Sequence, residues 1–463
     1  MVYRWDGATW NLIDTLYQQN HNDMQQTHFG GNLELSSDGN IMAVAATGTG
    51  DRTGMVYVYT LDDSDTNNIH YAQRGSTIHD IYETDTNSIS YNNGTINNHN
   101  KHRKIAMSAD GQYLAIGSPY YDDLHKGLVS NVNIYKWNSS LNEWEIDQTL
   151  SASARNKRFG FSLAMSQNGN KLVIMENEAM HYYERENGSF VQKWSIDSNQ
   201  YTDFNNMVTN IENTTNLIID CKNLIRFAPD GSKFFVGFPA QNKVYVFHAS
   251  SSYDSNNDSI ITNTNTTLTF GFNLDGTSTK LAVADRQGHG TVYYYELSSE
   301  NTWTLIKTYT GPRNLDQNGT LTNDRYGYGI SLTNTLIAIG SPRFSNGSIV
   351  DIVALVDGSL FNINTILVTD RLGYNYAHDV THASFLATQD QFYNNGVTAF
   401  SLTNAPTGSV QQYTVTHNTI SATENTFVGS GDSFSLNSTP TGRLSAFTQS
   451  HPILTALDSN GTV

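Results

Sequence analysis

Short apolar runs recur along the whole chain, separated by polar turns that often contain glycine. One phrase consists of an apolar run, a polar Gly turn and a second apolar run, and it returns about seven times at a spacing of roughly 45–70 residues. The clearest copies are KIAMSADGQYLAIGSP from Lys104, FGFSLAMSQNGNKLVIM from Phe159 and YGYGISLTNTLIAIGSP from Tyr326. A third run rich in Val and Tyr follows, and often a fourth that starts on Trp or Phe. Four short strands per repeat predict an all-β fold, a β-propeller.

The repeat predicts a single propeller domain over residues 1–463, with about seven four-stranded blades and eight as the alternative. The predicted units cover residues 29–103, 104–158, 159–216, 217–267, 268–325, 326–373 and 374–419. Residues 1–28 supply the outer strands VYRW and WNLI of a closing blade, and residues 420–463 supply closing strands and a tail. TISATENTFV and DSFSLN would then complete a blade shared by both chain ends, which removes open sheet edges. Residues 62–100 form a polar insertion, with extra strands predicted at NIHYAQ and SISYNN.

Four aspartates precede glycine between the predicted first and second strands of a unit. An Asp-Gly pair favours the positive φ that a tight hairpin needs. We therefore interpret these carboxylates as turn residues and not as ligands. They are Asp38, Asp110, Asp230 and Asp275.

An aromatic-Gly pair opens the first strand in Phe159-Gly160 and Tyr326-Gly327, and Ile-Gly-Ser-Pro ends the second strand at Ile116–Pro119 and Ile339–Pro342. In these two elements the chain resembles the FG-GAP repeat of integrin-α-type propellers, over about Phe29 to Phe400. The resemblance implies a propeller used for recognition or adhesion, usually outside cells. It also implies calcium in the loop after the second strand, which needs six to eight oxygen ligands. Only Asp122 and Asp123 offer adjacent carboxylates there, so we expect no metal and no cofactor.

The chain carries a formal net charge of −17, and only 15% of its residues are charged. This balance argues against nucleic acid as a partner, and no apolar run is long enough for a membrane span. The few basic residues nevertheless gather in the loops that enter the first strand and in those that join the second strand to the third. In a propeller both sets of loops open on one face, which would suit an acidic partner or a glycan, although surface charge can also be mere solvation. The residues are Arg52, Lys101, Arg103, Lys126, Arg155, Lys157, Arg158, Arg286, Arg325, Arg343 and Arg371.

Catalytic motifs are missing from the sequence: it has no G-x-S-x-G elbow, no P-loop and no dinucleotide fingerprint. We expect no enzyme, but a structural or recognition propeller on a virion or in an extracellular setting. Its partners would be other structural proteins of a surface assembly, or a glycan or protein of a host surface. The N-terminus lacks the basic and apolar regions of a signal peptide, which fits a virion protein released by lysis. The alternatives are a carbohydrate-active enzyme on a propeller scaffold and a fragment of a larger bacterial or algal adhesin.

Overall fold

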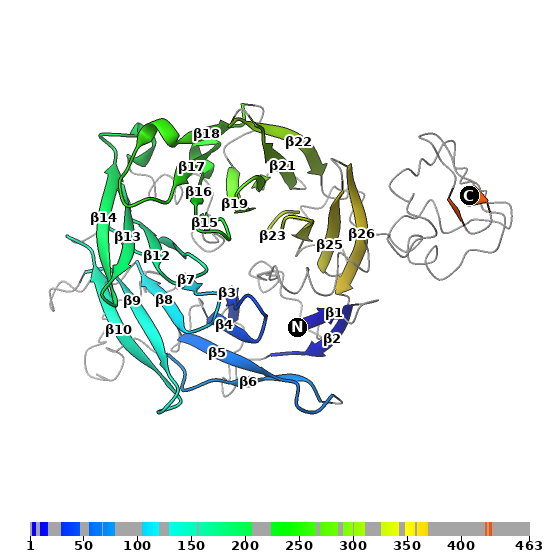
Figure 1. Ribbon diagram of the computed structural model, residues 1–463, viewed down its shortest axis with the longest axis horizontal. Helices are drawn as coiled ribbons and strands as arrows, with labels where there is room; N and C mark the ends of the chain where they lie inside the picture. The colour runs from blue at the N-terminus through cyan, green and yellow to red at the C-terminus, as the bar shows by residue number, and fades with distance from the viewer. Residues whose placement is uncertain are drawn as a thin grey trace, which may run out of the picture.

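The computed structural model is a β-propeller built from consecutive antiparallel sheets (Figure 1). Each blade is formed by four strands that follow one another in the chain, and every strand pairs with its neighbours in sequence order. The structure describes residues 2–5, 10–16, 29–46, 55–66, 68–78, 104–119, 129–154, 157–205, 224–264, 269–285, 290–299, 301–310, 326–341, 348–356, 359–368, 422–423 and 426–427.

Six blades are complete in the described part of the chain. Blade 1 contains β3 (Phe29–Leu35), β4 (Ile41–Ala46), β5 (Met55–Asp62) and β6 (His70–Gln73). Blade 2 contains β7 (Lys104–Met107), β8 (Tyr113–Ser118), β9 (Asn131–Asn138) and β10 (Glu143–Ser151). Blade 3 contains β11 (Ser162–Met165), β12 (Lys171–Met175), β13 (Ala179–Glu186) and β14 (Ser189–Asp197).

The remaining blades follow the same order along the chain. Blade 4 contains β15 (Ile225–Phe227), β16 (Lys233–Phe238), β17 (Lys243–His248) and β18 (Ser259–Thr262). Blade 5 contains β19 (Phe270–Gly276), β20 (Lys280–Asp285), β21 (Thr291–Leu297) and β22 (Trp303–Thr310). Blade 6 contains β23 (Gly329–Leu332), β24 (Leu336–Ser341), β25 (Ser348–Val356) and β26 (Ser359–Val368). The described residues also include three short 3-10 helices: η1 (Thr202–Phe204), η2 (Pro239–Gln241) and η3 (Ser255–Asn257).

The predicted number of seven or eight four-stranded blades is wrong for the described residues, which form six. VYRW and WNLI do form strands, β1 (Val2–Trp5) and β2 (Trp10–Asp14), and these pair with each other in a two-stranded sheet. Figure 1 places this sheet between blade 1 and blade 6. Val2 and Ile13 pack against the apolar cluster of blade 1. Within the described ranges, the N-terminal strands therefore extend the ring without making a further four-stranded blade.

Among the described residues, the predicted blade shared by both chain ends does not form. Within TISATENTFV, β27 (Ala422–Thr423) and β28 (Thr426–Phe427) pair with each other, and neither pairs with β1 or β2. Pairing between near neighbours closes a much shorter loop than pairing across the whole chain, so its entropic cost is lower. The proposed partner strand DSFSLN, the segment SISYNN and the unit at 374–419 lie outside the described residues. NIHYAQ does contain a strand, β6, which is the fourth strand of blade 1.

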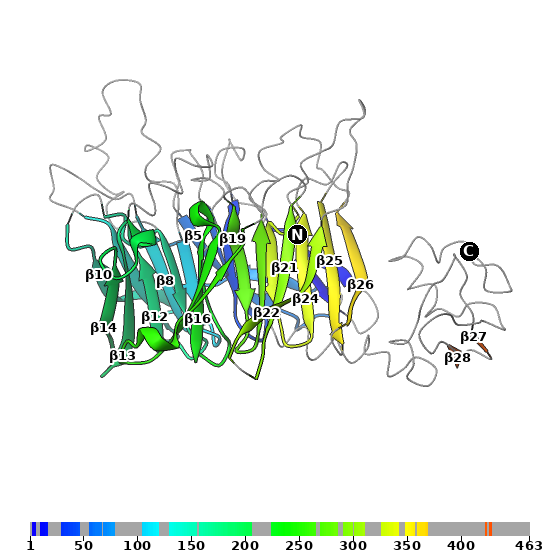
Figure 2. The same cartoon turned by 90° about the horizontal axis from the view of Figure 1, so that it is seen from above.

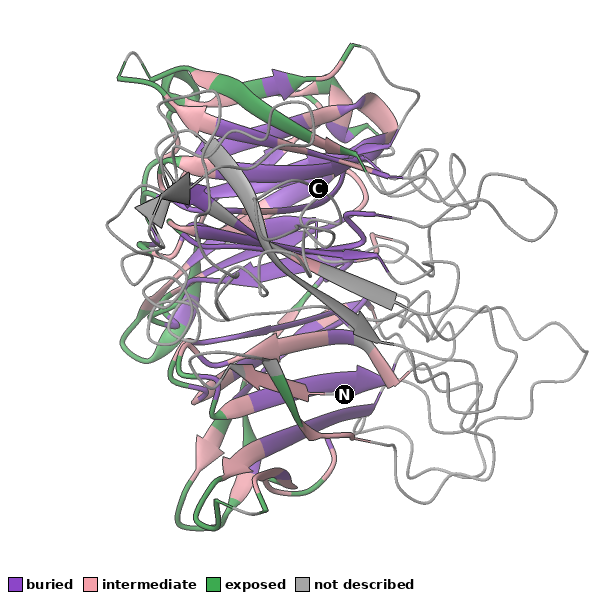
Figure 3. Cartoon of the chain, turned by 90° about the vertical axis from the view of Figure 1, so that its right-hand side faces the viewer, coloured by how far each residue is buried: buried purple, intermediate pink, exposed green. Residues whose placement is uncertain are grey.

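The core lies between adjacent blades, where Figure 3 colours the inner strands as buried. One apolar cluster joins Val132 of blade 2 to Leu163 and Ile174 of blade 3, and other clusters join the neighbouring pairs in the same way. A single small sheet cannot cover both of its own faces, so each blade depends on the next for burial. This explains why the repeats carry apolar residues in nearly all of their first, second and third strands.

Glycines of the repeated phrase sit where consecutive blades meet. Gly160 of the Phe-Gly pair has φ +88, a conformation that side chains with a Cβ rarely adopt. A Cβ on Gly117, in the Ile-Gly-Ser-Pro element of the preceding blade, would lie 2.5 Å from the carbonyl oxygen of Gly160. Gly237 and Gly271 meet in the same way between blades 4 and 5. The Phe-Gly element of one blade and the Ile-Gly-Ser-Pro element of the preceding blade thus contact each other through their backbones.

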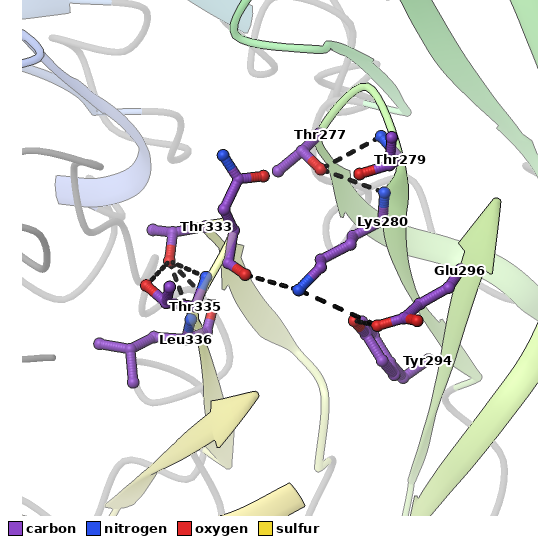
Figure 4. Close-up of polar contacts among 9 residues, drawn as sticks. Thr277, Thr279, Lys280, Tyr294, Glu296, Thr333, Thr335 and Leu336 are labelled. Carbon is purple, nitrogen blue, oxygen red and sulfur yellow. Dashed lines mark hydrogen bonds and ion pairs between the residues drawn. The ribbon is translucent and has the colours of Figure 1, made fainter. Parts of the chain in front are cut away.

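Lysine side chains add polar links between blades. Lys171 at the start of β12 donates to the backbone oxygens of Gly231 and Ala249 in blade 4, both at 2.8 Å. The equivalent Lys280 of blade 5 donates to the backbone oxygen of Asn334 in blade 6 at 2.6 Å (Figure 4). Each lysine therefore ties its own second strand to the next blade.

Candidate binding site at the propeller axis

The first strand of each blade is the innermost, and one position on it faces a common cavity at the propeller axis. When the blades are aligned on the Phe-Gly pair or on the hairpin turn, six residues occupy this position, one from each blade. They are Glu34, Ala106, Ala164, Arg226, Asp275 and Ser331, in the order of the blades. The cavity has a volume of about 160 Å³. Three blades thus contribute small side chains, and three contribute ionisable ones.

Arg226 of blade 4 and Glu34 of blade 1 form an ion pair across the axis. The Nη1 of Arg226 donates to the Oε1 of Glu34 at 2.7 Å, and the side chains are 19% and 13% exposed. Burial by itself lowers the pKa of Arg226, but the carboxylates of Glu34 and Asp275 outweigh burial and raise it. The guanidinium therefore stays charged, and Glu34 accepts one of its hydrogen bonds.

Asp275 of blade 5 is the second carboxylate of the cavity. Its Oδ2 accepts the backbone N–H of Leu332 in blade 6 at 2.7 Å, and its Oδ1 accepts the backbone N–H of Gly276 at 3.0 Å. Burial raises the pKa of Asp275 to about 6, although the positive charge of Arg226 and the two N–H groups act in the opposite direction. The side chain keeps part of its surface open to the cavity. Near pH 6 this group changes charge inside the ring.

The interpretation of Asp275 as a turn residue is therefore wrong. In blades 1 to 3 a serine starts the hairpin and accepts the N–H five residues later; for example, Ser166 Oγ accepts from Lys171 at 2.9 Å. In blade 5 Thr277 takes this place and accepts the N–H of Lys280, only three residues later, at 3.1 Å (Figure 4). The turn is two residues shorter, so Asp275 and Gly276 belong to β19. Asp38, Asp110 and Asp230 do accept hydrogen bonds within their turns, as predicted.

The ion cluster as a whole was missed by the sequence analysis. A usable signal existed: FGGNLEL from Phe29 and FGFNLDG from Phe270 share the spacing Phe-Gly-x-Asn-Leu-acid, which places Glu34 and Asp275 at equivalent positions. Arg226 has no such signal, because its blade lacks the Phe-Gly pair. Only the position of the hairpin turn brings it into register with the other two.

The cavity lies near the end of the innermost strands, toward the hairpin turns that join first and second strands; we call this end the hairpin face. Figure 2 shows β19 running toward it. The predicted basic loops belong to the opposite end of the same strands. Most of those residues lie outside the described part of the chain: Arg52, Lys101, Arg103, Lys126, Arg155, Arg286, Arg325, Arg343 and Arg371. Their role in binding stays a prediction.

Two of the predicted basic residues are described. Lys157 pairs through Nζ with Glu178 Oε2 at 2.9 Å, and this hydrogen bond raises the pKa of the lysine. Arg158 is partly buried and has φ 56. Their role in binding a partner stays a prediction.

The metal candidates Asp122 and Asp123 lie outside the described residues. Among the residues that are described, no group of three or more His, Cys, Asp or Glu side chains is arranged to hold a metal ion. The same residues include no helix with the length and apolar character needed to cross a membrane.

Comparison with known proteins does not assign this chain to a family. No protein-family model matches the chain, and no curated protein matches its sequence. A periplasmic gluconolactonase from Pseudomonas aeruginosa is similar with a TM-score of 0.46 at 13% identity, covering 79% of this chain and 91% of the other. A functionally unknown protein from Desulfotomaculum acetoxidans gives a TM-score of 0.44 at 12% identity, covering 77% and 89%. Sqt1 from Saccharomyces cerevisiae gives 0.44 at 9%, covering 75% and 76%.

Proposed function

We propose that this chain is a non-enzymatic recognition propeller of a virion or cell surface, which binds a protein or glycan partner at the axial cavity on its hairpin face. The observation that supports the proposal is the convergence of Glu34, Arg226 and Asp275 from three blades. The fold does not require these charges, because Ala106, Ala164 and Ser331 occupy the same position in the other blades. Removing charged side chains from bulk water costs free energy, so their presence where other blades carry Ala or Ser supports a role beyond packing.

The test is to find a partner and to ask whether its binding depends on the cavity. The intact protein would be screened against a glycan array and against a displayed random-peptide library. Each ligand would then be measured with a Glu34→Gln/Asp275→Asn variant, which retains the shape of both side chains. The matched control is Arg4→Met/Asp63→Asn, which removes an exposed ion pair of 3.3 Å elsewhere on the molecule.

We expect at least one ligand whose binding weakens tenfold or more in the cavity variant and not in the control. Ligands that bind all three proteins equally would overturn the proposal and move the contact to another surface. Release of free sugar from an arrayed glycan would overturn its non-enzymatic part.

A carbohydrate-active enzyme is the second candidate, and one observation favours it. Glu34 and Asp275 present two carboxyl groups in different settings, one paired with Arg226 and the other with its pKa raised to about 6. Glycoside hydrolysis uses two carboxyl groups whose environments hold them in different protonation states. Hydrolysis of a panel of aryl glycosides by the intact protein, lost in Asp275→Asn, would support this candidate. No turnover of any member would exclude these substrates.

A further inference from the structure

The charges of the axial cavity do not cancel. Arg226 is engaged by Glu34 at 2.7 Å, which offsets its charge locally. Asp275 has no cation within ion-pair distance among the described residues, and the donors that reach it are the neutral N–H groups of Leu332 and Gly276. With all three groups ionised, the cluster carries one net negative charge.

The cavity wall also contains apolar residues. Leu35, Met107, Met165, Phe227 and Leu332 line it beside the ion cluster. A volume of about 160 Å³ holds several water molecules, each of which takes about 30 Å³ in the liquid. A short unbranched alkyl chain would therefore find both room and apolar contact before it reached the carboxylate.

From this combination we propose that the cavity binds a primary alkylammonium group, as at the end of a lysine side chain presented by the partner; this inference rests on the proposed function. The ammonium would donate to Asp275, and its methylene stem would lie against Met107, Met165 and Phe227. Lysine stems bury along apolar surface in this manner while the charged end seeks a polar site.

Other ligand chemistries fit the site less well. A carboxylate or phosphate ligand would have to displace Glu34 from Arg226 and would be repelled by Asp275. A guanidinium binds best when both oxygens of a carboxylate are available for a two-pronged contact. Each oxygen of Asp275 already accepts a backbone N–H, so a compact ammonium with freely oriented donors suits it better.

The experiment uses three small probes that differ only in the end group. Nα-acetyl-lysine methylamide, the norleucine analogue and the glutamate analogue would each be titrated into the full chain, with binding followed by NMR line shifts and calorimetry. We expect millimolar binding of the lysine probe and at least tenfold weaker binding of the other two. Asp275→Asn should weaken the lysine probe at least fivefold. The control Asp230→Asn, which removes a carboxylate from the turn of blade 4 on the same face, should leave binding unchanged.

Equal binding of the lysine and norleucine probes would overturn the inference in favour of a purely apolar pocket, and preferred binding of the glutamate probe would overturn it in favour of an anion site at Arg226. Failure of the lysine probe to bind at tens of millimolar would overturn the inference as well.

The proposed function has a separate readout. If a partner found by screening depends on the cavity but is unaffected by acetylation of its amines, the ammonium inference fails and the proposed function stands. If no partner depends on the cavity, the proposed function itself fails.

Discussion

Arg226 of blade 4 donates a 2.7 Å hydrogen bond to Glu34 of blade 1, which lies 192 residues earlier in the chain. Most other links between blades join immediate neighbours, as the lysine and glycine contacts do. This ion pair instead spans the axis and connects the innermost strands of opposite sides of the ring. The two residues of this ion pair line the same axial cavity as Asp275.

Replacing Arg226 by methionine should destabilise the protein. The change leaves Glu34 and Asp275 partly buried without their countercharge, which costs about 3 kcal/mol of unfolding free energy at pH 7. Arg4→Met is the control, because its partner Asp63 is 53% exposed and such surface pairs contribute under about 1 kcal/mol. Chemical denaturation of both variants measures the difference. Equal losses would mean that the axial pair contributes no more than a surface pair.

The stability of the ring should depend on the ionisation of Asp275. Its pKa rises from 3.8 in the unfolded chain to about 6 in the folded protein, so between these values the folded state holds a proton that the unfolded state has released. The stabilisation of the folded state by this proton is fully present below pH 3.8 and is lost as the pH rises through about 6. The shift of about two units corresponds to at most about 3 kcal/mol, and to less because the group is partly open to the cavity.

The Asp275→Asn variant isolates this effect from the other carboxylates. Between pH 4 and pH 7 the intact protein should lose about 1–3 kcal/mol of unfolding free energy relative to the variant. Denaturant titrations of both proteins at four pH values provide the comparison. Parallel pH profiles would show that Asp275 titrates alike in the folded and unfolded states.

Gly117 should not tolerate a methyl group. Its added Cβ would lie 2.5 Å from the backbone oxygen of Gly160 and 2.9 Å from Cδ2 of Leu163, so the two blades would have to separate. We expect Gly117→Ala to lower the unfolding free energy by about 2–3 kcal/mol. Gly188→Ala is the comparison: its φ is +89 but nothing lies within 4 Å of the added Cβ, so only local strain of about 1 kcal/mol applies. A larger loss at Gly188 would contradict the inter-blade explanation of the motif.

Removal of divalent cations should leave the fold nearly unchanged. The sequence around Asp122 and Asp123 lacks the acidic spacing of a calcium loop, and a metal that binds only the folded state would raise its stability by mass action. We therefore expect EDTA to shift the melting temperature by no more than about a degree. A large loss in EDTA that calcium restores would reveal a metal site in this propeller.

The sequence by itself determined the strand quartets and most of their turns. NIHYAQ could be predicted as a strand, and Asp38, Asp110 and Asp230 as turn residues, because these features depend on residues close together in the chain. The apolar pattern also predicted a propeller, since a small sheet with two apolar faces must pack against others like it.

The tertiary structure alone decided which strands complete a blade and where the ionisable groups meet. At the two chain ends, β1 pairs with β2 and β27 pairs with β28. The pattern of apolar and polar residues does not specify which strands pair. The sequence predicted Asp275 as a turn residue because Asp-Gly strongly favours a turn. The turn that starts at Thr277 is shorter than in the other blades, so Asp275 lies in the strand β19. Its position beside Arg226 and Glu34 at the axis depends on how far the chain turns between blades 1, 4 and 5. Packing between neighbouring blades sets that rotation, so it cannot be predicted from any single segment of the sequence.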